Sequence, residues 1–272
     1  MRLLAPGAAS MQFTRAIVRP PGRSFAAGLS SAGEGPPDLD RALEQHAAYV
    51  QALRDRGIQV TQLPADEAYP DGTFVEDTAI VSARGAIVTR PGAPSREGEV
   101  SSIAQCLRQF YAERHAIEAP GTLDGGDICE VDGHFLIGVS ARTNADGAQQ
   151  LARHLHRLGY GSSVVDIRGR PALLHLKSGI AYLGEGLWVV QGAVQHELQA
   201  LQGFDNVRDP IVAAPAEAYA ANCVRVNDAV FVAAGYPIMK TALERRGCRV
   251  VALEMSEFKK MDGGLSCLSL RF

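Results

Sequence analysis

The stretch GDICEVDGHFLIG, residues 126–138, carries the clearest folding signal in this sequence. Two short runs of β-forming residues flank its central Asp-Gly pair, a dipeptide typical of the two-residue turn of a β-hairpin. Apolar residues then recur at helical spacing over residues 148–158, between Asn144, a suitable N-cap, and Gly159, which can end a helix. This region therefore predicts a β-hairpin followed by a helix.

The same order recurs along the chain at a period of roughly 45–50 residues, in the range typical of repeat architectures. Apolar runs at residues 163–167 and 248–253 follow helical patterns and predict a third strand, so the complete unit is hairpin, helix and strand. Further hairpins are predicted around Arg84-Gly85, Gly184-Glu185-Gly186 and Asn227-Asp228, and further helices over residues 100–110 and 237–246.

The N-terminal part of the chain contains only a portion of this unit. Thr14–Val18 predicts one strand, Asp38–Arg56 a helix and Ile58–Leu63 a second strand. The missing strand can come from Leu265–Phe272, which no helix follows. Pairing the two ends would close a ring and remove the exposed sheet edges of a linear array. We therefore predict an α/β fold: a five-bladed, pseudo-symmetric α/β propeller of ββαβ units around a central channel.

The composition is that of an ordinary globular protein. Of the 272 residues, 46% are hydrophobic and 21% charged, and the formal net charge of −3 gives no reason to expect nucleic acid or an anionic membrane as partner. No apolar run approaches the ~20 residues that a membrane span needs. We expect residues 14–272 to form a single catalytic domain and residues 1–13 a disordered extension, with Met1 or Met11 as the native start.

The cysteines and the N-terminus indicate the compartment. Five cysteines, an odd number without a C-x-x-C pair, argue against a disulfide framework and a zinc ribbon and favour a reducing, cytoplasmic setting. The first ten residues lack the apolar stretch of a signal peptide. Four of the cysteines are expected to be small buried hydrophobes: Cys106, Cys129, Cys223 and Cys248.

Chemically capable residues lie just before the predicted hairpins, at Glu76-Asp77, Asp124, His175 and Cys267. If the units are equivalent, these positions converge at one end of the channel, on connections that a rigid scaffold holds. Taken singly, each residue has two interpretations. Cys267, which follows two glycines, is a reactive thiol or a core residue of the last strand. His175 is an acid–base group or a hydrogen-bonded strand histidine, and Asp124 is its partner or a turn carboxylate.

With these motifs in view, the chain resembles the dimethylarginine dimethylaminohydrolases, a family within the guanidino-group-modifying enzymes. The resemblance covers nearly everything from Arg15 to Phe272, and this many ordered segments are more specific than any one of them. It is carried by GLSS (28–31), ALEQH (42–46), FVEDTAIV (74–81), IVTRPGAPSR (87–96), IEAPGTLDGGD (117–127), GVSARTN (138–144), LLHLKSG (173–179), AANC (220–223) and DGGLSCLSLRF (262–272).

The resemblance implies a five-bladed α/β propeller and a set of site residues. Cys267 would be the nucleophile, His175 the general acid and base, and Asp124 the carboxylate that orients the histidine, a position where bacterial relatives can carry glutamate. The residues expected to bind substrate are Asp71, Glu76 and Asp77 around the guanidinium, Arg96 and Arg142 on the α-carboxylate, and Leu29 through a main-chain contact from a loop over the site.

The implied reaction is hydrolysis of Nω-methylated arginine to citrulline and an alkylamine through a covalent thiouronium on the cysteine. A small-molecule substrate is then the expected partner, and no metal or other cofactor is needed. Two alternatives stay open: an arginine deiminase-like or other guanidino amino-acid hydrolase of the same superfamily, and a non-catalytic ring that binds an arginine-like ligand. The preference among methylated and unmethylated arginine, and whether the ring forms a homodimer, are also open.

Overall fold

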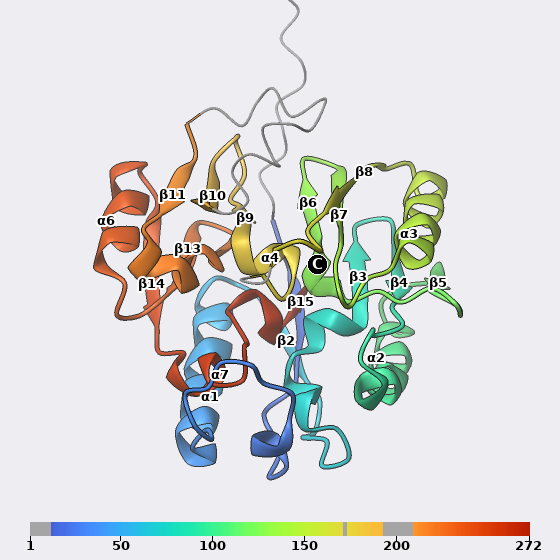
Figure 1. Cartoon of the computed structure of the whole chain (residues 1–272), viewed down its shortest axis with the longest axis horizontal. Coiled ribbons are helices and arrows are strands. Elements are labelled where there is room, and N and C mark those ends of the chain that lie inside the picture. Colours follow the sequence, from blue (N-terminus) through green and yellow to red (C-terminus); the bar gives the residue numbers. More distant parts are fainter. Residues whose placement is uncertain (1–11, 171–172, 193–208) are drawn as a thin grey trace, which may run out of the picture.

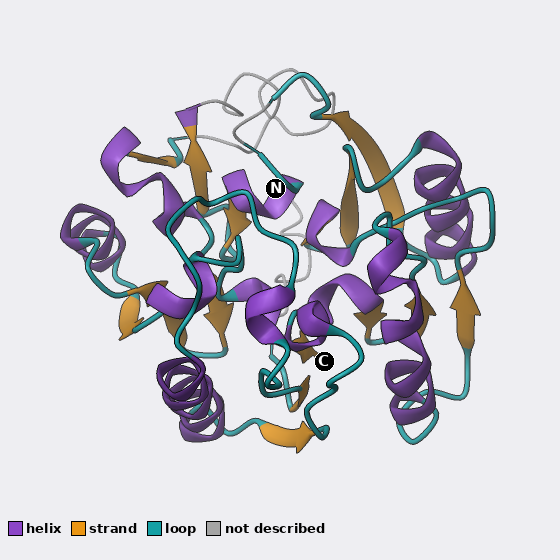
Figure 2. Ribbon diagram, turned by 60° about the horizontal axis from the view of Figure 1, so that its bottom comes forward, coloured by secondary structure: helices purple, strands orange, loops and turns teal. Residues whose placement is uncertain are grey.

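The computed structural model describes residues 12–170, 173–192 and 209–272. Within these residues the strands form five three-stranded sheets around a common centre, with the longer helices at the periphery (Figures 1 and 2). In each sheet the middle strand pairs antiparallel with one neighbour and parallel with the other. The fold is therefore a five-bladed α/β propeller, as the repeat predicted.

The blade β6-β7-β8 shows how the sequence builds one unit. Strands β6 (Ile128–Val131) and β7 (His134–Val139) pair antiparallel across Asp132 and Gly133, whose φ angles are 49° and 80°. A two-residue hairpin turn of type I′ requires this left-handed conformation at both central positions. Helix α3 (Ala145–Arg157) then returns the chain to β8, which runs parallel to β7.

Helix α3 begins and ends where its sequence signals predict. The side chain of its N-cap, Asn144, accepts a hydrogen bond from the Gly147 N–H, and Gly159 at a φ of 79° ends the helix. Leu151 and Leu155 face inward and are fully buried. The apolar spacing in the sequence thus fixes which face of the helix packs on its sheet.

Two other blades repeat this order, and one more has the same strand pairing, with residues 193–208 between its second and third strands outside the described part of the chain. Strand β8 (Gly161–Asp166) completes the blade described above. One further blade contains β3 (Ala79–Ser82), β4 (Gly85–Val88), α2 (Val100–Leu107) and β5 (Arg114–Ala116), and another contains β9 (Ile180–Tyr182), β10 (Trp188–Gln191) and β11 (Ile211–Ala213). A third contains β12 (Val224–Val226), β13 (Ala229–Ala233), α6 (Pro237–Arg245) and β14 (Arg249–Leu253), and the short helix α7 (Ser256–Lys259) follows it.

The fifth blade joins the two ends of the described chain. Strand β1 (Arg15–Val18) runs parallel to β2 (Gln59–Gln62) after helix α1 (Leu39–Asp55), and on its other side it pairs antiparallel with β15 (Leu270–Arg271). The register places Ile17 opposite Leu270. This pairing closes the ring and confirms the predicted role of the last strand.

The last strand is shorter than predicted. The expected strand Leu265–Phe272 contains a 3₁₀ turn at Ser266–Leu268, and only β15 pairs in a sheet. The backbone N–H of Ser266 donates to the side chain of Asn222 (3.0 Å) and that of Cys267 to the Gly264 carbonyl (3.2 Å). These two N–H groups are therefore not available for hydrogen bonds to a neighbouring β-strand.

The segment around His175 also differs from its predicted strand. His175 has extended backbone angles but directly precedes a short helix, α4 (Leu176–Gly179). The Leu176 N–H donates to the Asp127 carboxylate at 3.0 Å, and the Ser178 N–H donates to the His175 carbonyl at 3.1 Å. A side chain 49 residues away in sequence thus satisfies the first donor of the helix.

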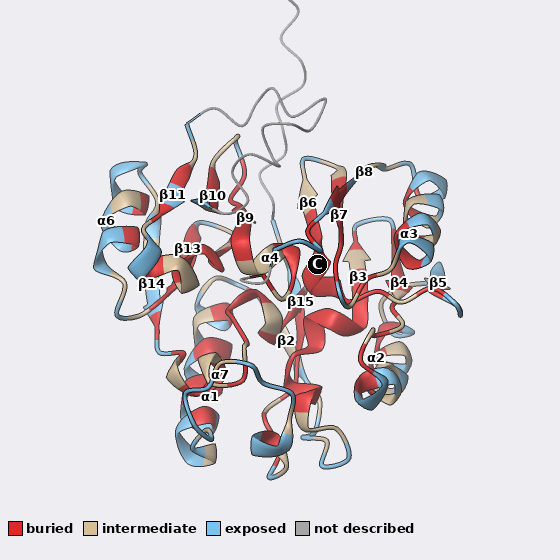
Figure 3. Ribbon diagram, viewed as in Figure 1, coloured by how far each residue is buried: buried red, intermediate tan, exposed pale blue. Residues whose placement is uncertain are grey.

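Buried residues concentrate on the inner faces of the blades, while the outward faces of α3 and α6 are exposed (Figure 3). Among the described residues, no helix is long and apolar enough to cross a bilayer. Residues 1–11 of the predicted N-terminal extension lie outside the described residues.

Candidate active site

A pocket at one end of the central channel collects most of the predicted site residues. It lies near α4 and near the segments that precede β3 and β15 (Figure 1). Seven of the nine predicted residues line it, whereas Asp124 and Glu76 lie behind and beneath the wall. The lining residues are Leu29, Asp71, Phe74, Asp77, Arg96, Arg142, Leu174, His175, Met261, Asp262, Gly263 and Cys267.

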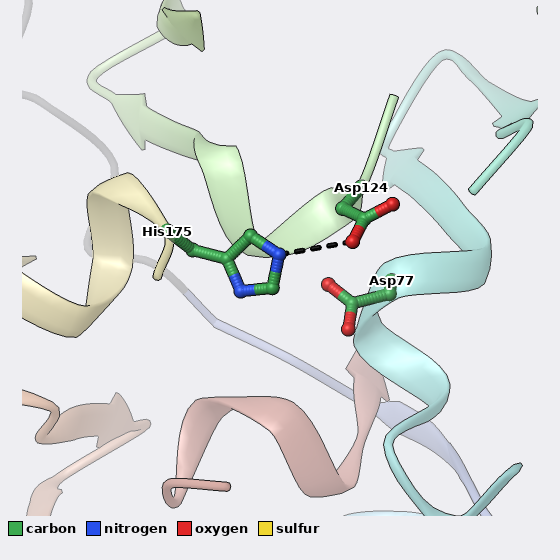
Figure 4. A group of neighbouring side chains, drawn as sticks. All are labelled: Asp77, Asp124 and His175. Carbon is green, nitrogen blue, oxygen red and sulfur yellow. Dashed lines mark hydrogen bonds and ion pairs between the residues drawn. The ribbon is translucent and has the colours of Figure 1, made fainter. Parts of the chain in front are cut away.

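Asp124 holds the imidazole of His175. The Nε2 atom of His175 lies 2.9 Å from Oδ2 of Asp124 (Figure 4). The other carboxylate oxygen, Oδ1, accepts a hydrogen bond from the Gly92 N–H at 2.8 Å. Asp124 is 0% exposed, so this pair is shielded from water. The carboxylate therefore fixes the orientation of the ring and stabilises its charged form.

A second buried carboxylate, Asp77, lies beside Asp124 and close to the same ring (Figure 4). Its Oδ2 accepts a hydrogen bond from Nη1 of Arg96 at 2.6 Å and its Oδ1 accepts from the Gly126 N–H at 2.8 Å. Burial alone would raise the pKa of Asp77, but the charges of His175 and Arg96 lower it to about 2. The Asp77 carboxyl is therefore charged at neutral pH.

The same carboxylates control the protonation of His175. Burial favours the neutral ring, but the charge of Asp77 and the hydrogen bond to Asp124 outweigh it and raise the pKa of His175 to about 9. Asp127 adds to this effect through its charge. At neutral pH the ring is therefore an imidazolium, which can act as a general acid.

Cys267 lies on the 3₁₀ turn before β15, and its side chain is partly exposed to the pocket. Its Sγ accepts a hydrogen bond from the Gly264 N–H at 3.4 Å. Burial, followed by the negative charges of Glu76 and Asp77, raises the pKa of Cys267 to about 12. The sulfur is thus a thiol at neutral pH, and a cation beside it would favour the thiolate.

Leu29 and Asp71 form the rim of the pocket. Both oxygens of the Asp71 carboxylate accept hydrogen bonds from the Leu29 N–H, at 3.1 and 3.2 Å. Two residues further on, the N–H and hydroxyl of Ser31 donate to Asp262 at 2.5 and 2.9 Å. The loop that the sequence placed over the site is therefore attached to the pocket at two points.

Glu76 lies beneath the pocket rather than in its wall. Its Oε1 accepts a hydrogen bond from Nζ of Lys177 at 2.6 Å, and its Oε2 accepts one from the hydroxyl of Ser266 at 2.8 Å. Glu76, Lys177 and Ser266 also line a second cavity in the centre of the ring. These three residues thus separate the pocket from the central channel.

The two predicted carboxylate-binding arginines have different surroundings. Arg96 is 4% exposed, and its guanidinium is shared between Asp77 and Glu99, with Nη2 2.9 Å from Glu99. Arg142 is more exposed, and its Nη1 lies 4.0 Å from the Asp124 carboxylate. Arg142 is therefore the freer of the two to bind a ligand anion.

Asp77, Asp124 and His175 place one donor atom each within 4.8 Å of one another, a spacing that a metal ion could bridge. Their charges are already balanced, because Arg96 is bonded to Asp77 and the histidine is protonated at neutral pH. A metal ion would have to displace that proton, because His ligates through a neutral nitrogen. The arrangement therefore favours proton transfer over metal binding.

Comparison with known proteins identifies the family. The family model for N,N dimethylarginine dimethylhydrolase, eukaryotic, matches residues 37–209. The N(G),N(G)-dimethylarginine dimethylaminohydrolase of Pseudomonas aeruginosa is 44% identical over 261 residues, covering 96% of this chain and 100% of the relative. The chain belongs to the dimethylarginine dimethylaminohydrolase family. The Streptomyces coelicolor member is 33% identical and covers 96% of this chain and 98% of its own length.

Solved structures of dimethylarginine dimethylaminohydrolases have the same fold. A cysteine-to-serine variant of the Pseudomonas aeruginosa enzyme, complexed with citrulline, superposes with a TM-score of 0.91 at 44% identity and covers 96% of this chain and 100% of its own. The N-terminal domain of a cyanobacterial arginine dihydrolase reaches a TM-score of 0.86 at 19% identity, covering 96% of this chain and 97% of its own, which shows the shared fold alone.

Sequence reasoning missed several polar residues behind this dimethylarginine dimethylaminohydrolase-type pocket. Asp127 accepts hydrogen bonds from Ser140 (2.7 Å) and Thr143 (2.6 Å) as well as from the N-terminus of α4. Thr143 in turn accepts one from the Asp124 N–H. The available signal was the second aspartate of the GTLDGGD segment, Asp127, which directly precedes a predicted hairpin strand.

Proposed function

We propose that this protein hydrolyses Nω-methylated arginine to citrulline and an alkylamine, with Cys267 as the nucleophile. One observation carries the proposal: Cys267 and His175, far apart in sequence, line one pocket together with acidic and basic side chains. Relatives named for this reaction support it, because they cover 96% of the chain and one is complexed with citrulline.

Binding prepares the nucleophile. A guanidinium carbon is a poor electrophile, so the attacking group must be the thiolate. The empty site holds a thiol, because burial and the acidic neighbours raise the pKa of Cys267. A guanidinium cation that enters between the sulfur and these acids compensates their charge, and the thiol proton is then lost to solvent.

The first half-reaction forms a bond between Sγ of Cys267 and the guanidinium carbon, which gives a tetrahedral adduct. The imidazolium of His175 donates its proton to the alkylated nitrogen, and the bond from carbon to that nitrogen breaks. The alkylamine leaves and a thiouronium remains on Cys267. Asp124 keeps the ring oriented while its charge changes, as in a triad-like arrangement.

The second half-reaction consumes one water. The neutral His175 takes a proton from the water as its oxygen attacks the thiouronium carbon. The hydroxyl of the resulting tetrahedral adduct loses its proton to solvent as the C–S bond breaks, so the thiolate is regenerated and neutral citrulline is released. The cycle thus restores the imidazolium, and Cys267 takes up a proton from solvent again once no cation lies beside it.

The remaining side chains fit the recognition of an amino acid with a cationic end. Asp71 and Asp77 face the pocket, and Glu76 supplies negative charge from beneath it. Charge-assisted hydrogen bonds to these carboxylates would hold the plane of the guanidinium. Arg142, with Arg96 behind it, would bind the α-carboxylate at the other end of the substrate.

We place this reaction in the cytoplasm. All five cysteines are unpaired, which fits a reducing compartment. A thiol nucleophile also needs reducing conditions to stay active.

A release assay tests the function. Asymmetric dimethylarginine, monomethylarginine and arginine are offered in turn, and citrulline and the released amine are identified. We expect dimethylamine and methylamine from the methylated substrates, and no turnover after Cys267→Ser or His175→Ala with the fold retained by circular dichroism. Ammonia from arginine as the main product would instead assign an arginine deiminase, and tight binding without any product would assign a binding protein. Full turnover by Cys267→Ser would exclude the mechanism.

A further inference from the structure

We propose that Asn222 is a positioning residue that sets the spacing between the two catalytic segments. The inference rests on the proposed function, in which Cys267 and His175 act on one guanidinium. Asn222 does not line the pocket, so it cannot act on the substrate directly. It acts through its neighbours, and we call its set of hydrogen bonds the Asn222 clamp.

The clamp joins one residue from each catalytic segment. Nδ2 of Asn222 donates to the carbonyl of Lys177 at 3.0 Å, on the short helix that follows His175. Oδ1 of Asn222 accepts from the N–H of Ser266 at 3.0 Å, next to the nucleophile. One planar carboxamide therefore fixes the distance between the histidine-bearing and the cysteine-bearing backbone.

Further side-chain hydrogen bonds connect the clamp into a closed network beneath the pocket. Nδ2 of Asn222 also donates to the hydroxyl of Ser266 at 3.1 Å, and that hydroxyl donates to Glu76 at 2.8 Å. The other oxygen of Glu76 accepts from Nζ of Lys177 at 2.6 Å. The orientation of Glu76, which supplies charge to the guanidinium, thus depends on the same carboxamide.

The local packing makes room for this carboxamide. Asn222 is 8% exposed, and a Cβ added at Gly264 would lie 2.5 Å from its Cγ and Oδ1. Any larger residue at 264 would therefore push either the carboxamide or the cysteine-bearing turn. A buried amide with its hydrogen bonds made adds directional constraint that an apolar side chain of the same size cannot provide.

The two segments need such a constraint because each is short. Helix α4 spans four residues and the turn before β15 spans three, so neither has the length that stiffens a longer helix. A displacement of reacting groups by about 1 Å costs on the order of 100-fold in rate. Loss of the clamp should therefore lower kcat far more than it changes KM.

Two substitutions separate position from charge. Asn222→Leu fills a similar volume and removes all three hydrogen bonds of the Asn222 side chain. Asn222→Asp keeps the acceptor for the Ser266 N–H but loses both donors, to the Lys177 carbonyl and to the Ser266 hydroxyl. We expect both to lower kcat by about 100-fold with little change in KM. We also expect iodoacetamide to alkylate Cys267 faster in Asn222→Leu, because a loosened turn exposes the sulfur.

Asn227 offers a matched control. Its Oδ1 accepts from the N–H of Phe13 at 2.8 Å, and its Nδ2 donates to the carbonyls of Phe13 (3.0 Å) and Arg56 (2.8 Å). Like Asn222 it accepts one hydrogen bond and donates two, but between segments to which we assign no catalytic residue. Asn227→Asp and Asn227→Leu should lower the unfolding midpoint without lowering kcat per folded molecule.

The outcomes are distinguishable. A normal kcat in Asn222→Leu, a loss confined to Asn222→Asp, or an equal loss in the Asn227 variants would overturn the clamp. If the wild-type protein releases no amine from methylated arginine, the proposed function fails, and the alkylation rates alone then decide: equal rates for wild type and Asn222→Leu would overturn the clamp, and a faster variant would support it.

Discussion

At the scale of single residues, one group of carboxylates raises the pKa of both His175 and Cys267. The shift helps the histidine to act as an acid, but it opposes ionisation of the thiol. The charge of Asp77 raises the pKa of both His175 and Cys267, so the empty site holds an imidazolium beside a neutral thiol. In the proposed mechanism the histidine can donate its proton at once, whereas the sulfur has to lose a proton before it can attack. The positive charge of the bound substrate has to offset these carboxylates before the thiol can ionise.

This imbalance predicts the pH dependence of Cys267 alkylation in the ligand-free protein. Only the thiolate reacts, and a pKa raised to about 12 means that the thiolate fraction grows tenfold per pH unit without reaching a plateau between pH 7 and 9. Glu76→Gln removes a charge that raises this pKa, so it should speed alkylation at pH 8. Iodoacetamide labelling followed by mass spectrometry measures the rate, and a plateau below pH 9 would contradict the expectation.

The two arginines should respond differently to removal. Arg142→Ala should raise KM by about 10- to 100-fold with a smaller effect on kcat, since a hydrogen bond to a charged group contributes about 1.5–3 kcal/mol. Arg96→Ala should instead lower the unfolding free energy by about 3–5 kcal/mol, because it removes the cation that the buried Asp77 and Glu99 share. Steady-state kinetics and urea unfolding measure the two effects; an unchanged KM in Arg142→Ala would remove it from the site.

At the scale of elements, local signals predicted the hairpins and helices well and the catalytic segments poorly. Asp132-Gly133 and Gly159 adopt the left-handed angles that their positions suggest. By contrast, α4 depends on the carboxylate of Asp127, and the turn of Cys267 depends on the carboxamide of Asn222. These partners are distant in sequence, so no local pattern could reveal that they replace strand pairing.

Two glycines should separate a conformational role from a contact role. Gly133 has a φ of 80° with nothing within 4 Å of an added Cβ, whereas an added Cβ at Gly264 would meet Asn222 at 2.5 Å. Gly133→Ala should lower stability by about 1–3 kcal/mol and leave kcat unchanged. Gly264→Ala should lower kcat through displacement of the cysteine-bearing turn. Thermal unfolding and turnover, measured on both proteins, give the comparison, and a normal kcat in Gly264→Ala would show that the turn tolerates the shift.

At the scale of the whole molecule, the repeat was enough to predict the five blades and the meeting of Asp77, Asp124, His175 and Cys267 at the centre. It could not predict that Glu76 lies beneath the pocket or that Glu99 shares Arg96, because both depend on side-chain packing between blades. We propose that residues 14–272 form one domain, since the last described strand pairs with the first.

Removal of Leu270–Phe272 should abolish activity and lower the unfolding midpoint. These residues supply β15, and the ring of Phe272 lies 5.3 Å from those of Phe110 and Tyr111, centroid to centroid. Without them β1 has an unpaired edge, and the turn of Cys267 is no longer continued by a strand that pairs in the sheet. Size-exclusion chromatography and turnover check the result, and a truncated monomer with normal activity would contradict it.

The pairing of β1 with β15 has a consequence for assembly. The segment that locks the circle also delivers the sulfur, since Cys267 lies three residues before β15. In the proposed mechanism, a molecule whose last segment has not docked lacks the attacking sulfur in its pocket, whatever the state of its histidine and acids. Activity should therefore appear in the same folding step as the pairing that closes the propeller, and intermediates with an open propeller should be inactive.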